Sequence, residues 1–391
     1  MKGKLLLSII VLSSLVFACS KDDPGPMVDP KPSDLRILFI ENSEGAPISR
    51  FLGELKCIDA EGNNLTEVTS NSALSAVFVT SSDDFSKATF QAIIDNPCSP
   101  MDIFSLDTRT LSYERKTNSI GRALTHGCKD LTTYSDPWTS PDGSAIAVVK
   151  SDQNSNDIVI LDRNGQEEIN LSSIINLEIK SNYKPRWSPD GTKIAFSTRH
   201  YTNDEKTEAM WRICVINRDG TNPVFIGSFS AAINTPIWSP DGSKIIYHVF
   251  LQDPSDLFKT ILDTSMIMNS DGTNNRTLAP QFEYVFIGNQ SWFEDSKRVL
   301  SIVTTDPDLA TEIVIIDAET GQHQQVTDVT PPLKTDISLS PDEEWILYVG
   351  SESTAQENTE NVWKIRVDGS ENTKLTDINY VTTATWVKSS Q

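Results

Sequence analysis

A short unit, Trp-Ser-Pro-Asp-Gly, constrains the fold of this chain more than any other feature. It occupies residues 187–191 and 238–242, and a longer copy reads Trp138-Thr139-Ser140-Pro141-Asp142-Gly143. With weaker copies at Trp292 and Leu339, the unit returns about every 50 residues. Proline presets φ at the second position of a tight turn, aspartate can bond its own backbone, and glycine tolerates the exit geometry. Each copy therefore predicts a hairpin, and repetition at this period predicts a radial or solenoid array of hairpins.

Each repeat continues in the same way after its first hairpin. A second strand and a polar stretch of variable length lead to a third β-rich run, as at 157–162 and 211–217. Tight-hairpin signals follow these runs at Asn164-Gly165 and Asp219-Gly220. Four strands in each repeat are typical of a β-propeller blade.

The two ends of the repeat region complement each other. Residues 36–66 match strands two to four of a blade, whereas 383–387 match a first strand with nothing after it. We therefore expect the C-terminal strand to complete the N-terminal blade and to remove free sheet edges. With a degenerate unit at 76–113, this predicts an all-β, seven-bladed propeller over residues 35–391, or six blades if residues 72–115 have another role.

The repeat at 187–196, Trp-Ser-Pro-Asp-Gly-Thr-Lys-Ile-Ala-Phe, resembles that of the TolB-like β-propellers, and the resemblance extends over nearly the whole chain after residue 34. The resemblance implies the propeller fold. The protein TolB has a separate α/β domain before its propeller and works in an envelope complex, whereas a short Pro-rich stretch stands at that place here. The resemblance therefore does not imply TolB's partners for this chain.

Residues 1–18 have the features of a secretory signal peptide. Lys2 and Lys4 precede an apolar run at 5–17 that is too short to span a bilayer with margin. Ala18-Cys19-Ser20 then resembles a bacterial lipoprotein cleavage site, so we expect Cys19 to be lipidated and to begin the mature chain; the alternative is a plain signal peptide with an incidental cysteine. Residues 19–34 carry four prolines among Gly, Asp and Ser and predict a disordered tether.

These features predict an outer-membrane lipoprotein in the cell envelope of a Gram-negative bacterium, facing the periplasm or the cell surface. The lipid anchor would be its one link to the membrane. The chain has 33 basic and 54 acidic residues and a formal net charge of −21. This charge argues against nucleic acid or an anionic membrane surface as the principal partner.

The cysteines after Cys19 form two groups. Cys98 and Cys128 lie in loop-like sequence, and they are a candidate disulfide because an exported chain meets an oxidising compartment. Cys57 and Cys214 lie in alternating apolar stretches and are expected to be buried thiols.

The sequence contains few signs of catalysis. It has no Gly-x-Ser-x-Gly elbow, Walker loop or His-Glu-x-x-His motif. Oligogalacturonate lyases, which resemble this fold, hold a divalent metal among His and Gln side chains near the axis, but the four histidines here occupy unequal positions in the repeat. We expect no cofactor. Residues 152–157 resemble a fragment of a calcium loop, although turn chemistry explains them better.

We expect the binding residues on the face opposite the Pro-Asp-Gly and Asp-Gly turns. This face carries the links between blades and the longest insertions, at 198–210, 250–265 and 351–361. The starts of the first strands bring aromatic, amide and charged side chains toward its central mouth: Tyr134, Asp136, Tyr183, Lys184, Arg186, Asn234, Asn289, Gln290 and Asp336.

We interpret the chain as a non-catalytic binding or scaffold propeller that recognises an envelope protein or a surface glycan. The alternative is a carbohydrate-active enzyme of the oligogalacturonate-lyase type with a metal on the propeller axis. A third interpretation of the mouth residues is that they only solvate the channel.

Overall fold

The computed structural model describes residues 34–42, 53–69, 74–82, 85–94, 101–124, 127–175, 181–201, 205, 209–229, 232–253, 256–282, 290–304, 311–327, 333–352, 359–378 and 380–389. The predicted leader, Cys19, most of the tether, Cys98 and Asn289 lie outside these ranges, so the candidate disulfide does too. In the described ranges, no helix is long and apolar enough to cross a membrane.

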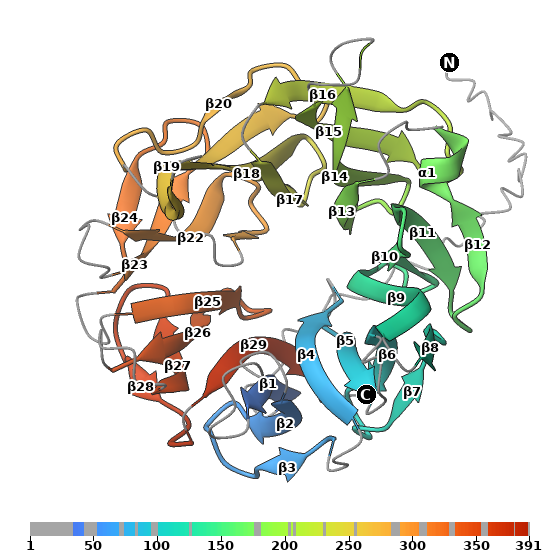
Figure 1. The fold of residues 1–391 in the computed structure, drawn as a ribbon. Helices are drawn as coiled ribbons and strands as arrows, with labels where there is room; N and C mark the ends of the chain where they lie inside the picture. The colour runs from blue at the N-terminus through green and yellow to red at the C-terminus, as the bar shows by residue number, and fades with distance from the viewer. Residues whose placement is uncertain are drawn as a thin grey trace, which may run out of the picture.

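The described chain is an all-β propeller. Figure 1 shows a ring of radial sheets, with β4, β13, β17, β25 and β29 nearest to its centre. Three four-stranded sheets follow chain order: β13 (Asn182–Trp187), β14 (Lys193–Tyr201), β15 (Ala209–Asn217) and β16 (Val224–Phe229); β17 (Ala232–Trp238), β18 (Lys244–Asp253), β19 (Asp256–Asn269) and β20 (Arg276–Thr277); β21 (Ser291–Trp292), β22 (Arg298–Thr304), β23 (Thr311–Asp317) and β24 (His323–Gln325).

Two further sheets follow the same rule. One consists of β25 (Leu333–Leu339), β26 (Trp345–Ser351), β27 (Glu360–Arg366) and β28 (Thr373–Lys374). The other consists of β9 (Gly127–Thr139), β10 (Ala145–Ser151), β11 (Asn156–Asp162) and β12 (Glu167–Asn170), with β8 (Ile120–Leu124) paired to the start of β9 and the short α1 (Leu171–Ile174) after β12.

The last sheet brings the two ends of the chain together. It contains β1 (Leu35–Asn42), β2 (Gly53–Asp59), β3 (Thr66–Glu67), β4 (Leu74–Ser81), β5 (Lys87–Ile94), β6 (Met101–Asp107), β7 (Tyr113–Arg115) and β29 (Val381–Lys388). β29 pairs antiparallel with β1, with Trp386 opposite Ile37, and the two strands lie side by side in Figure 1. A single pair, Gly53 with Ala76, links β2 to β4.

The hairpin register corrects the alignment of the repeats at Trp138. Trp187 lies opposite Ile194, but Thr139 lies opposite the equivalent Ile146. The extra residue before Ser140 therefore places Trp138 at the position that Arg186 occupies in the next repeat. Aligning the repeats on Trp138 is wrong by one residue.

Indole groups connect neighbouring sheets. The Nε1–H of Trp187 donates to the backbone oxygen of Trp138 at 3.1 Å, and that of Trp238 donates to Arg186 at 3.3 Å. Trp386 repeats the contact with Ser338 at 3.1 Å. Each of these rings packs between two sheets and satisfies its polar atom there, as buried tryptophan requires.

The hydrophobic core lies between the sheets. One cluster joins Ala147 and Ile158 to Trp187 and Cys214 of the next sheet. Cys57 and Cys214 are buried free thiols, as predicted, and burial raises the pKa of Cys57 to about 11 and that of Cys214 to about 12.

A hydroxyl that follows the fourth strand caps the third strand in several sheets. The Ile103 N–H donates to Thr117 Oγ1, and the Ile313 N–H donates to Thr327 Oγ1, each across 14 residues. Leu55, Ile158 and Val362 make the same bond to Thr69, Ser172 and Thr376. Gly227, 14 residues after Ile213, leaves the β13–β16 sheet without this cap.

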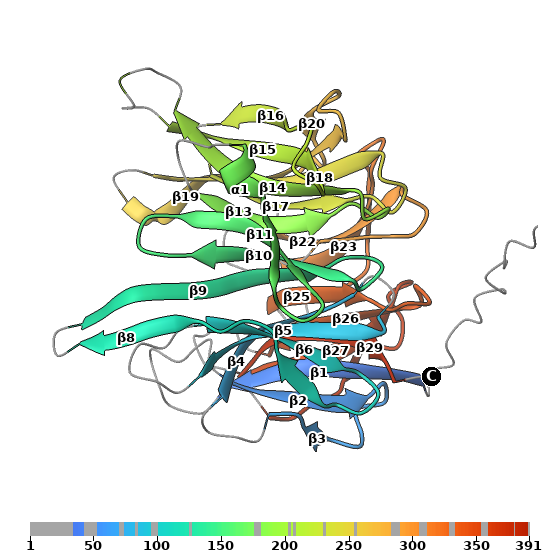
Figure 2. The same cartoon turned by 90° about the vertical axis from the view of Figure 1, so that its right-hand side faces the viewer.

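Strand pairing enters two of the predicted loops. Residues 198–201 and 209–210 extend the β14–β15 hairpin, and residues 250–253 and 256–265 extend the β18–β19 hairpin, because antiparallel pairing continues past the body of each sheet. Figure 2 shows the β8–β9 and β18–β19 hairpins projecting from the same side of the ring.

Candidate functional site

A β-bulge interrupts several first strands at an equivalent place. Asp136, Lys184 and Thr235 each precede a proline and have φ of 51°, 54° and 32°. The register of β9, β13 and β17 shifts at these points. Left-handed backbone is uncommon for residues other than glycine, and bulges reorient side chains near functional sites.

The same position can be followed around the propeller. Each of these residues stands three positions before Thr139, Trp187 or Trp238, the residues that open the Pro-Asp-Gly hairpins. Asp336 and Thr383 stand three positions before Leu339 and Trp386, and the corresponding Asn289 is outside the described ranges. We call the set Asp136, Lys184, Thr235, Asp336 and Thr383 the bulge ring.

Neighbouring members of the bulge ring bond to each other. Lys184 Nζ lies 2.5 Å from Asp136 Oδ1, with side chains 36% and 16% exposed. Asp336 Oδ2 accepts hydrogen bonds from Thr383 Oγ1 at 2.8 Å and from the Ala384 N–H at 3.1 Å. These contacts join first strands of adjacent sheets.

Other predicted mouth residues have separate surroundings. Arg186 is 7% exposed, its Cζ lies 3.9 Å from the Trp138 ring centroid, and its Nη1 donates to the Pro185 oxygen at 2.8 Å. Gln290 Nε2 donates to Ser301 Oγ at 2.9 Å. Asn234 pairs with His248 in the β17–β18 register.

Tyr134 precedes Asp136 of the bulge ring by two residues on β9. It lines a cleft of about 470 Å³ together with Arg115, Asn164 and Glu167, between the β4–β7 strands and the next sheet. Burial raises the pKa of its hydroxyl.

Tyr183 belongs to a cluster that the sequence analysis missed. Its ring centroid lies 5.9 Å from that of Trp211, and Arg199 Cζ lies 5.6 Å from the same Trp211 ring. Arg199 and Trp211 are directly paired on β14 and β15, and Trp211 packs against the core shared with the β17–β20 sheet. We call Tyr183, Arg199 and Trp211 the aromatic platform. A tryptophan at the start of a third strand, outside the hairpin unit, was the available signal.

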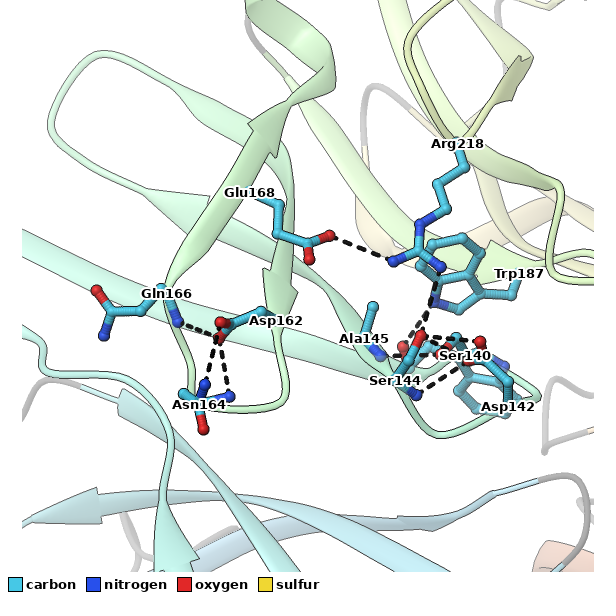
Figure 3. A network of polar contacts seen from close by, with 11 residues as sticks. Ser140, Asp142, Ser144, Ala145, Asp162, Asn164, Gln166, Glu168, Trp187 and Arg218 are labelled. Atoms are coloured by element: carbon cyan, nitrogen blue, oxygen red, sulfur yellow. Dashed lines mark hydrogen bonds and ion pairs between the residues drawn. The ribbon is translucent and has the colours of Figure 1, made fainter.

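The face with the turns carries a second cleft, of about 560 Å³, lined by Glu168, Thr192 and Arg218 among others. Figure 3 shows the Arg218 guanidinium over Trp187, 5.4 Å from the ring centroid, with bonds to Glu168 Oε2 at 3.3 Å and Ser144 Oγ at 3.4 Å. In the nearby turn, hydrogen bonds from the Ser140 hydroxyl and the Ser144 N–H lower the pKa of Asp142 to about 2. These contacts hold turns and sheets together.

The histidines do not converge. His200, His248 and His323 lie on β14, β18 and β24, and His126 is outside the described ranges. In the part of the chain that the structure describes, no group of three or more His, Cys, Asp or Glu side chains could hold a metal ion. The calcium-like stretch is a turn in which Asp152 Oδ1 accepts from the Asn154 and Ser155 N–H groups at 2.7 and 2.8 Å.

Comparison with known proteins places these features in a family. The model of the TolB β-propeller domain matches residues 195–389. An uncharacterised peptidase, YuxL of Bacillus subtilis, is 21% identical over 230 residues, which are 56% of this chain and 29% of the relative. The chain therefore spans less than a third of the length of that curated relative.

Two solved structures share the fold. The β-propeller domain of the Trilobed protease from Pyrococcus furiosus has a TM-score of 0.60 at 13% identity, over 90% of this chain and 94% of that chain. An oligogalacturonate lyase in complex with manganese has a TM-score of 0.55 at 16% identity, over 86% of this chain and 84% of that chain. At these identities the likeness extends to the fold alone.

Proposed function

Because the chain is a TolB-like β-propeller, we propose that it is an exported binding protein of the cell envelope that recognises another envelope protein at the mouth lined by the bulge ring. The observation that carries this proposal is the recurrence of positive φ at Asp136, Lys184 and Thr235, on three successive sheets. Strained backbone persists where the surrounding structure enforces it, and it is concentrated at binding sites. The side chains differ from sheet to sheet, which suits recognition of one particular surface.

We further propose that the propeller has seven blades and that β29 closes the ring. The grouping of β29 with β1, β2 and β3, and of β4 with β5, β6 and β7, supports two four-stranded blades inside the eight-stranded sheet. The other sheets supply the remaining five. In this arrangement neither end of the chain leaves a free sheet edge.

The location of the protein is part of the same proposal. The sequence supports a signal peptide over residues 1–18, a lipid on Cys19 and a tether to residue 34, and hence an outer-membrane lipoprotein facing the periplasm or the surface. A disulfide between Cys98 and Cys128 would fit the oxidising compartment that such a protein meets.

Co-purification from detergent-solubilised membranes tests the binding role. The wild-type protein should retain one partner that Asp136→Asn with Lys184→Met loses. A matched pair on the turn face, Asp219→Asn with Asp271→Asn, should retain it. Equal retention by the mouth variant, or loss only in the turn-face variant, would place recognition elsewhere.

A further inference from the structure

Arginines in this propeller often lie over aromatic rings beside a carboxylate. Arg218 covers Trp187 and pairs with Glu168 (Figure 3). Arg366 lies 4.5 Å from the Trp345 centroid, with Glu371 at 2.9 Å. Arg298 lies 4.1 Å from the Phe293 centroid, with Asp295 at 2.6 Å. In each arrangement the ring supports one face of the guanidinium, and a carboxylate accepts its N–H groups.

Arg199 and Arg212 differ from these three in having a ring but no carboxylate among the described residues. Arg199 lies over Trp211, and Arg212 lies 5.9 Å from the Phe225 centroid. In the described part of the chain, neither guanidinium has a carboxylate partner, and the Nε atom of each is buried without a hydrogen-bond partner. A buried donor without an acceptor is destabilising, whereas the bond it would make to a carboxylate is among the stronger ones.

Both arginines lie at the same end of one hairpin. Arg199 pairs with Trp211 and Thr198 pairs with Arg212, so the two cations occupy consecutive rungs on opposite faces of the β14–β15 hairpin. His200 occupies the rung after Arg199, opposite Met210, and burial together with the nearby Arg212 lowers its pKa. Among the described residues, this end of the hairpin therefore has one arginine without a carboxylate on each face, in a chain with a net charge of −21.

We propose that the aromatic platform binds a carboxylate from an acidic peptide segment of the partner protein, held by the Arg199 guanidinium over Trp211. This inference rests on the proposed function, because Tyr183 of the platform is the chain neighbour of Lys184 in the bulge ring. The two Nη groups at the end of the guanidinium, beyond the buried Nε, can donate to the two oxygens of a carboxylate. Trp, Tyr and Arg are also the residues that dominate the energetics of protein interfaces, so a peptide suits the platform better than a sugar acid.

The test uses the full mature protein with arginine and tryptophan labelled with ¹⁵N. The probe is the capped pentapeptide Gly-Glu-Leu-Glu-Gly, and the control probe has Gln in place of both Glu residues. The acidic peptide should shift the Arg199 Nε–H and Trp211 indole resonances saturably, and the Gln peptide should not. Arg199→Lys keeps the charge but loses the planar fork, so we expect affinity to fall about tenfold or more.

Arg218→Lys is the matched control. Arg218 also covers a tryptophan, but Glu168 already supplies its carboxylate, so this variant should bind the acidic peptide as the wild type does. An equal loss of affinity in both variants would contradict a specific site at Arg199. Thermal unfolding of both variants identifies any loss that comes from misfolding.

Three other results would overturn the proposal of an acidic peptide. A shift with oligogalacturonate but not with the acidic peptide would make the ligand a sugar acid. A shift of the Arg199 resonance when Asp204→Asn and Glu208→Gln are made without any probe would place the carboxylate within this chain. Retention of the membrane partner by Arg199→Lys would exclude an acidic peptide as the ligand of the aromatic platform. The proposed binding role at the mouth would be unaffected.

Discussion

Lys184 and Asp136 form an ion pair between equivalent bulge residues of adjacent sheets, with Nζ and Oδ1 2.5 Å apart. Both residues were predicted from the sequence to reach the mouth, but not to bond to each other. The Lys184 side chain remains about a third exposed, so the pair can exchange its partner for a ligand at modest cost. We therefore expect loss of the ion pair to affect binding more than the free energy of unfolding.

We expect Lys184→Met to lower the free energy of unfolding by only about 0–1 kcal/mol, because exposed ion pairs contribute little. Urea denaturation measures this change. The exchange of both charges, Asp136→Lys with Lys184→Asp, should preserve stability and still lose the membrane partner. Recovery of the partner in the exchanged variant would show that the pair is structural only.

Arg186→Ala should be more damaging. The Arg186 side chain is almost fully buried over Trp138, so truncation removes a desolvated cation–π contact and the packing of the aliphatic chain. We expect a loss of about 2 kcal/mol. Tyr183→Ala, which removes a half-buried ring, should cost less, and equal losses in the two variants by urea denaturation would contradict this ranking.

Deletion of residues 380–391 tests the closure of the ring. Without β29, the pairing edge of β1 is exposed and Ile37 loses its opposite residue, Trp386. The truncated protein should aggregate or unfold without cooperativity. A melting curve identical to that of the full chain would contradict closure by β29.

Acid should destabilise the protein through its turns. Hydroxyl hydrogen bonds lower the pKa of Asp142 to about 2 and also lower the pKa values of Asp219 and Asp271. A carboxyl with a lower pKa in the folded state stabilises the fold above its unfolded pKa, and this contribution is lost as the pH falls through the folded value. The melting temperature should be flat from pH 7 to 5 and fall between about pH 4 and 2. Asp142→Asn should make that fall shallower. If the melting temperature of this variant depends on pH as that of the wild type does, the turn carboxylates are not the cause of the acid destabilisation.

Local turn chemistry accounts for what the sequence could predict. The Trp-Ser-Pro-Asp-Gly unit encodes its hairpin within a few residues, and the order of strands follows from its repetition. The misalignment at Trp138 arose because a one-residue insertion leaves the turn signal intact, and only the pairing of Thr139 with Ile146 reveals it. The prolines at 137, 185 and 236 mark the bulges in retrospect, since each follows a residue with positive φ.

Contacts between sheets account for what the sequence could not predict. Arg186 and Tyr134 were both predicted to reach the mouth, yet one covers Trp138 and the other lines a cleft beside Glu167. Which neighbour a strand residue faces depends on bulges and on the adjacent sheet, neither of which is local in sequence. The aromatic platform was missed for the same reason, because Arg199 and Trp211 meet only through the β14–β15 register.

Site-specific photocrosslinking in intact cells tests the central claim most directly. Thr235 in the bulge ring and the exposed Thr273 in the β19–β20 turn belong to the same sheet and provide a matched pair of positions for a photoreactive residue. Recognition at the mouth predicts one discrete cross-linked protein from position 235, lost with Lys184→Met, and none from position 273. A cross-link from position 273 alone would contradict recognition at the mouth.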